Sequence, residues 1–251
     1  MLVFAVLFLL YQSAEGVGAR LLHSFPVQAV LMSLVLPVAA GLGWIIFRAP
    51  LGCYQLDWGR GRMRILGCGL AAAVLAKAIA LVAGAWLGIY AIEWKPISPG
   101  QVPAVLLGAL GLTFIPSIAE DLLTRGLWYR RVAVGLPFIL LTATVYLLNH
   151  IFRLALGPIE WFRLFTFGLA YAAGVERTRT LWGAVGLHWG WNAANEISEL
   201  VLVVDVGSPP AAVAVSSFAH LALCAVVVFW WRPLDSSRGA ATPRKLGHDA
   251  C

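Results

Sequence analysis

Long apolar runs, separated by charged or Pro- and Gly-rich breaks, fill most of the sequence. Because about 20 helical residues cross a hydrocarbon core of about 30 Å, such runs predict membrane-spanning helices. Seven runs reach or approach that length: 26–47, 65–92, 102–130, 134–155, 161–175, 181–204 and 210–231. A shorter run, 2–11, counts as an eighth, N-terminal helix. The pattern therefore predicts an all-α, polytopic transmembrane helix bundle of about eight helices.

Composition agrees with this fold class. Hydrophobic residues make up 61% of the 251 residues and charged residues 12%, and the mean hydropathy is +0.84, whereas soluble domains contain about 25% charged residues. The net charge of +6 does not indicate a nucleic-acid partner, because the basic residues stand singly between apolar runs. The four cysteines lack a Cys-x-x-Cys spacing, so we expect free thiols. The apolar runs make the lipid bilayer the expected surroundings of the chain.

The basic residues indicate an orientation. Thirteen of the eighteen lie in four alternate segments, 48–64, 120–131, 176–180 and 232–251. The alternate breaks between them hold Arg20, Lys95, Arg153 and Arg163. Because loops rich in Lys and Arg stay in the cytoplasm, we predict that both termini are cytoplasmic. We further predict an integral membrane protein of a bacterial inner (plasma) membrane.

The domain organisation follows from the same pattern. No break before residue 231 is long enough to hold a soluble domain. We therefore predict one integral-membrane domain, 1–231, with a motif-bearing core at about 102–204. The last segment, 232–251, is rich in Ser, Gly, Pro and basic residues and is predicted to be a flexible cytoplasmic tail.

Polar residues inside predicted spans point to function, because ionisable groups in hydrocarbon cost a few kcal/mol or more each. Three segments concentrate them: Glu120-Asp121-Leu-Leu-Thr-Arg125, Tyr146-Leu-Leu-Asn149-His150 and His188-Trp-Gly-Trp-Asn192. A spacing of four residues puts both ends of the second and of the third segment on one helix face. Lys77 also lies inside a span, and we expect it to pair with a buried acid.

The three segments can meet at one depth. Glu120 and His150 each lie 15 residues from a predicted turn near 132–137, which places both about 20 Å along neighbouring antiparallel helices. His188 and Asn192, on a third helix, can reach a similar level. The resulting cluster would contain a carboxylate to deprotonate water, imidazoles to orient it and donors to stabilise an oxyanion, as amide hydrolysis requires.

These segments, in this order and on separate helices, resemble the CAAX-protease and bacteriocin-processing family (CPBP, or Abi), whose intramembrane glutamic endopeptidases are similar to the Ras-converting CAAX prenyl endopeptidase. The resemblance implies that Glu120, helped by His150, activates the water. It further implies that His188 and Asn192 hold the oxyanion, that Arg125 supports the acidic pair, and that no cofactor is needed.

Two positions depart from the family pattern. Asp121 stands where a second Glu is usual, so it either touches the water or only pairs with Arg125. Tyr146 stands where Phe is usual, and its hydroxyl could join the polar network. Family members act on prenylated CAAX-type proteins, on bacteriocins and other peptides, or on C-terminal membrane anchors. The resemblance therefore implies an intramembrane endopeptidase that acts on a membrane-associated protein or peptide.

Alternatives remain open from the residues alone. A non-catalytic membrane protein, such as a bacteriocin immunity factor, a scaffold or a transporter, could use the same polar cluster for binding. Two imidazoles and a carboxylate also suit zinc, so Glu120, His150 and His188 could hold a metal ion. Arg125, five residues after Glu120, could be an anchor at the cytoplasmic helix end.

Overall fold

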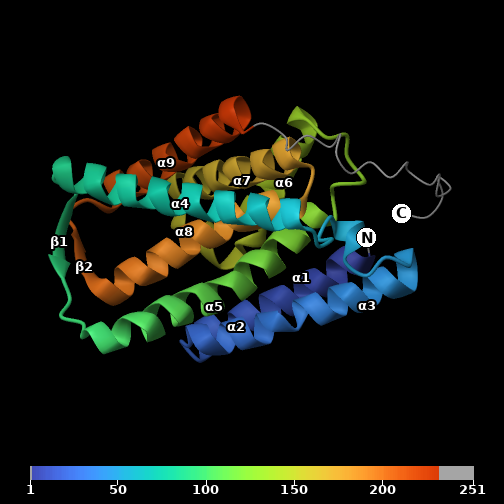
Figure 1. The fold of residues 1–251 in the computed structure, drawn as a ribbon, viewed down its shortest axis with the longest axis horizontal. Coiled ribbons are helices and arrows are strands. Elements are labelled where there is room, and N and C mark those ends of the chain that lie inside the picture. The colour runs from blue at the N-terminus through green and yellow to red at the C-terminus, as the bar shows by residue number, and fades with distance from the viewer. Residues whose placement is uncertain (1, 232–251) are drawn as a thin grey trace.

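The structure is a computed structural model that describes residues 2–231, and this part of the chain folds into a bundle of antiparallel helices (Figure 1). The long helices are α1 (Leu2–Ala14), α2 (Phe25–Ser33), α3 (Val35–Phe47), α4 (Arg60–Trp86), α5 (Val102–Asp121), α6 (Leu136–Asn149), α7 (Pro158–Thr178), α8 (Leu181–Val201) and α9 (Pro209–Trp230). Two π-helical segments, η1 (Glu15–Leu21) and η4 (Leu122–Gly126), continue α1 and α5. Short 3-10 helices are η2 (Gly52–Tyr54), η3 (Pro99–Gln101) and η5 (Ile151–Leu156). The strands are β1 (Tyr90–Trp94) and β2 (Leu202–Val206).

Several helical segments are long and apolar enough to cross a membrane. They are Leu2–Leu21, Phe25–Phe47, Arg60–Trp86, Pro99–Gly126 and Pro209–Trp230. Helices α7 and α8 have 21 residues each and carry more polar side chains, while α6 is a shorter apolar helix of 14 residues. The predicted all-α polytopic bundle is thereby confirmed, and the protein is an integral membrane protein.

Several predicted helix ends were wrong. The N-terminal helix, predicted as 2–11, continues through η1 to Leu21 and so has the length of a full span. The predicted spans 65–92 and 181–204 end earlier, at Trp86 and Val201. Two residues after Trp86, Gly88 adopts a positive φ of 69°, which suits the end of a helix.

The residues that follow these two helices form an antiparallel ribbon. Strand β1 pairs with β2 in a register that runs from Tyr90 opposite Val206 to Trp94 opposite Leu202. Both strands are rich in β-branched and aromatic residues, which favour extended structure. Because these residues are also apolar, hydropathy alone did not separate them from the helices before them.

Helix α8 occupies the middle of the bundle, where it packs against α4, α5 and α7. Its first eight residues, Leu181 to His188, are all buried. A Cβ atom at Gly186 would lie 2.5 Å from the Leu66 carbonyl oxygen, and one at Gly190 would lie 2.4 Å from that of Leu70. Glycine therefore lets α8 approach the α4 backbone closely, as small residues do between membrane helices.

The bundle has two ends of different character. The ribbon lies at one end, and the N-terminal end of α1 lies towards the other (Figure 1). We call them the ribbon end and the basic end, because at the second end the α3–α4, α5–α6 and α7–α8 connections and the helix termini beside them carry nine of the twelve Arg residues of the described part of the chain. The predicted cytoplasmic tail, 232–251, lies outside the described residues.

The α4–α8 contact predicts a stability effect. Gly190→Ala should lower the stability of the protein by about 1–3 kcal/mol, because overpacking a close contact costs that much. The control is Gly111→Ala, where a Cβ meets no atom within 4 Å and alanine is the better helix former. Thermal unfolding in detergent measures both; a Gly190→Ala protein as stable as the control would contradict the close approach of α4 and α8.

Candidate active site

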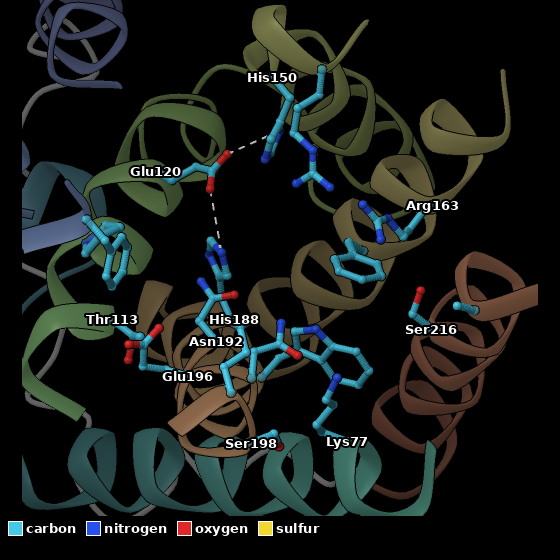
Figure 2. Close-up of a pocket in the computed structure, with 18 of the residues that line it drawn as sticks. Lys77, Thr113, Glu120, His150, Arg163, His188, Asn192, Glu196, Ser198 and Ser216 are labelled. Atoms are coloured by element: carbon cyan, nitrogen blue, oxygen red, sulfur yellow. Dashed lines mark ion pairs between the residues drawn. The ribbon is translucent and has the colours of Figure 1, made fainter. Parts of the chain in front are cut away.

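The three polar segments meet around one carboxylate. Glu120, on α5, is 4% exposed. Its Oε1 atom lies 3.5 Å from His150 Nδ1, and its Oε2 atom lies 3.6 Å from His188 Nε2. Figure 2 shows Glu120 pointing between the two histidines, with Asn192 beside His188. We call Glu120, His150, His188 and Asn192 the Glu120 cluster.

His150 reaches this position because α6 ends just before it. The predicted span 134–155 stops at Asn149, and His150 has a non-helical backbone with φ −85° and ψ 53°. The connection from α5 to α6 also differs from the predicted turn, since η4 ends at Gly126 and α6 begins only at Leu136. The ring is fixed by its Nδ1 atom, which lies 2.8 Å from the Tyr146 carbonyl oxygen one turn earlier.

His188 is held from two sides. Its Nδ1 atom lies 3.4 Å from Asp121 Oδ2, so the opposite ring nitrogen, Nε2, is directed to Glu120. Its ring stacks on Tyr171, with centroids 4.7 Å apart and planes 19° apart. The Tyr171 hydroxyl in turn lies 3.1 Å from His220 Nε2. The imidazole therefore cannot turn without disturbing packing and hydrogen bonds on three neighbouring helices.

Asp121 and Arg125 form an ion pair one helical turn apart, with both side chains fully buried. The Arg125 guanidinium also donates to Thr124 Oγ1 at 2.9 Å and lies 4.8 Å from the centroid of the Tyr146 ring. Arg125 is therefore no anchor at an exposed helix end, and that alternative is wrong. Asp121 faces Arg125 and His188 and does not line the cavity described below.

The supporting aromatic residue Tyr146 packs at the centre of these contacts. Its ring centroid lies 4.7 Å from that of His150 and 5.8 Å from that of His188. The predicted sharing of a helix face by Tyr146 and His150 thus brings the two rings together. Whether the Tyr146 hydroxyl takes part in the polar network stays a prediction.

Asn192 lies one turn beyond His188 on α8. Its amide nitrogen Nδ2 donates to Ser117 Oγ at 3.1 Å, and Ser117 lies one turn before Asp121 on α5. The hydrogen bond ties α8 to α5 next to Glu120. An amide carries two N–H donors, so this bond leaves a second donor for another group.

Sequence reasoning assigned no role to Asn149, which contacts Glu120, or to Gln12, which contacts Asn149. Asn149 Nδ2 donates to Glu120 Oε1 at 3.1 Å. Gln12, on α1, donates from Nε2 to the Asn149 carbonyl oxygen at 2.6 Å and to Asn149 Oδ1 at 3.0 Å. The signal for Asn149 was a second polar residue directly before His150. Gln12 gave none, because it lies just after the predicted N-terminal helix.

The Glu120 cluster lines a cavity of about 660 Å³. The cavity wall comes from both halves of the chain, and it includes residues of the ribbon, Tyr90, Val204 and Val206. The space around Glu120 thus continues along α8 towards the ribbon end of the bundle. A cavity of this size can hold a short stretch of peptide in addition to water.

Lys77, inside α4, also faces this cavity. Its Nζ atom lies 5.3 Å from the centroid of the Trp191 ring, a cation–π contact. Within residues 2–231 no carboxylate oxygen lies in ion-pair contact with Lys77. The expected direct pairing with a buried acid is therefore wrong.

Glu120, His150 and His188 are the side chains that the sequence offered as metal ligands. Among residues 2–231, no group of three or more His, Cys, Asp and Glu side chains is arranged to hold a metal ion. Glu120 turns one oxygen to each imidazole, so its carboxylate pairs directly with both histidines. Metal dependence and the catalytic roles of the cluster stay predictions at this point.

Comparison with known proteins identifies the segment that carries the site. Residues 102–194 match the family model described as type II CAAX prenyl endopeptidase Rce1-like. No curated protein and no solved structure matches the chain significantly. The matched segment contains all four residues of the Glu120 cluster, together with Asp121, Arg125 and Tyr146. Over this segment, which is less than half of the chain, the protein is similar to the Rce1-like type II CAAX prenyl endopeptidases, a family of proteases.

Proposed function

We propose that this protein is an intramembrane endopeptidase in which Glu120 activates a water molecule to cleave a peptide bond of a membrane-associated protein or peptide. One observation carries the proposal: a buried carboxylate at a cavity wall, with an imidazole opposite each of its oxygens at 3.5 and 3.6 Å. The match of residues 102–194 to a family of proteases supports it.

The reaction needs no nucleophile from the protein. Glu120 accepts one proton of a water molecule as the water oxygen attacks the carbonyl carbon of the substrate, and His150 orients that water. A tetrahedral intermediate with a negatively charged oxygen results. When the C–N bond breaks, the leaving nitrogen receives the proton that Glu120 accepted. The products are a new carboxyl group, which keeps the second proton of the water, and a new amino group, and Glu120 is again ionised.

In the proposed mechanism, His188 and Asn192 stabilise the oxyanion. They lie one turn apart on the face of α8 that lines the cavity. Fixed donors of this kind contribute about 3–4 kcal/mol each to the stability of a transition state. The second N–H of the Asn192 amide, not used by Ser117, is available for this purpose.

The remaining buried contacts position these groups. Asn149 donates to the Glu120 carboxylate and is itself held by Gln12, while Asp121 and Tyr171 hold the His188 ring. Arg125 compensates the charge of Asp121, which would otherwise be costly to bury. These residues act through Glu120 and His188, so we assign them positioning roles.

A Glu120→Gln substitution tests the proposal. It keeps the size of the side chain but removes the base, so cleavage should fall by a factor of about 10²–10⁴. The assay uses purified protein in detergent and quenched-fluorescent peptides ending in Cys-aliphatic-aliphatic-X, with and without a prenyl group on the Cys.

The matched control is Glu176→Gln, which removes a carboxylate from a surface ion pair with Arg179 at the basic end. Because surface ion pairs contribute little to stability, this variant should cleave like the wild type. A Glu120→Gln protein with wild-type folding and an undiminished rate would refute Glu120 as the base.

Metal dependence is a separate prediction. Because the proposed base and water-orienting groups are complete without a metal, chelators such as EDTA and 1,10-phenanthroline should leave the rate of peptide cleavage unchanged. The metal content of the purified protein should also stay well below one ion per chain. Loss of activity on chelation, with recovery on addition of zinc, would instead assign Glu120, His150 and His188 as ligands.

A further inference from the structure

The two ends of the bundle differ in the charges of their connections. Connections and helix termini at the basic end carry Arg48, Arg60, Arg62, Arg64, Arg130, Arg131, Arg177 and Arg179. Those at the ribbon end carry Arg20, Lys95, Arg153 and Arg163. Because Lys and Arg in short loops are retained in the cytoplasm, this distribution places the basic end on the cytoplasmic side.

The few cations of the ribbon end are largely compensated. Arg153 and Arg163 both pair with Glu160, and Arg20 lies 3.7 Å from Glu15. Further acidic residues of this end are Glu93, Glu196, Glu199 and Asp205. At the ribbon end acidic residues therefore outnumber basic ones, whereas at the basic end the Arg residues outnumber the acids that pair with them, Asp57 and Glu176.

The cavity of the Glu120 cluster opens at the ribbon end. Its lining runs from the buried Glu120 to the exposed side chains of Glu199 and Val206. Glu199 follows His188 by 11 residues on α8, a distance of about 16 Å along the helix axis. An extended peptide rises about 3.3 Å per residue, so about five residues reach from the mouth to Glu120.

Towards the basic end, Glu120 is closed off by packed side chains. Leu122 and Leu123 are fully buried, and Leu127 and Tyr54 are nearly so. Two cavities, of about 20 and about 310 Å³, have lining residues at this end, and neither is lined by a residue of the Glu120 cluster. Water and substrate therefore reach Glu120 from the ribbon end.

We propose that the Glu120 site opens on the non-cytoplasmic face of the membrane. Its substrate is then an extended segment of an exported peptide or membrane-anchored protein that is exposed on that face. A prenylated C-terminus in the cytoplasm would meet the closed end of the bundle. This inference rests on the proposed function for its substrate, but the side of the opening can be tested without any activity.

Cysteine labelling tests the side of the opening. Val206→Cys places a thiol at the cavity mouth, and Gly59→Cys places one in the α3–α4 connection, where a Cβ meets no atom within 4 Å. A membrane-impermeant maleimide, applied to intact cells, should label Val206→Cys above the background of the unsubstituted chain. Gly59→Cys should react only after the cells are permeabilised. The reverse pattern would overturn the inference.

Sealed vesicles test the side of the activity. The probe is a membrane-impermeant form of the peptide that is cleaved in detergent. It is added to the outside of right-side-out and of inside-out vesicles from the same cells, and Glu120→Gln vesicles serve as blanks. Because a charged peptide crosses a bilayer very slowly, cleavage should be at least about tenfold faster with right-side-out vesicles, and detergent should abolish the difference.

The outcomes separate the two proposals. Faster cleavage by inside-out vesicles would overturn the inference about the opening and leave the proposed protease function standing. No cleavage by either kind of vesicle, even in detergent, would contradict the proposed function, and the labelling result alone would then decide the side of the opening.

Discussion

A carboxylate that is kept inside a membrane needs partners, and the centre of this protein is built around that constraint. Glu120 is surrounded by His150, His188 and Asn149 rather than by lipid. Its neighbour Asp121 is compensated by Arg125, with both side chains fully buried. Removing a charge from water costs several kcal/mol unless a partner compensates it, so these contacts are a condition for folding. The same contacts leave Glu120 at a cavity wall, where the proposed mechanism has it act on water.

Rigid packing gives the site its geometry. Helix α8 carries two residues of the Glu120 cluster and runs through the middle of the bundle, close to α4 at Gly186 and Gly190. Aromatic rings fix the histidines, since Tyr171 stacks on His188 and Tyr146 packs against His150. Groups held in this way need little reorganisation in a transition state, which is the main source of catalysis by fixed dipoles and charges. The site and the core of the protein are therefore the same set of contacts.

The sequence predicted the parts of this arrangement that depend on helical spacing. Ionisable residues in apolar runs marked the three segments, and a spacing of four residues placed Tyr146 with His150 and His188 with Asn192. The sequence did not predict features that depend on where a helix ends or on contacts between residues far apart in the chain. The ribbon strands were included in helices because their residues are apolar as well as β-forming. Gln12 reaches Asn149 across 137 positions of the chain, and no local pattern indicates such a contact.

The central claim is that Glu120 makes this membrane protein a protease, and mapping of protein termini tests it in cells that contain the natural substrates. Membrane and secreted proteins are compared between cells with the wild-type protein and cells with Glu120→Gln at equal abundance. The account predicts new termini that occur only with the wild type, in segments exposed on the non-cytoplasmic face. Identical sets of termini would contradict it, and the Glu120 cluster would then have to serve in binding.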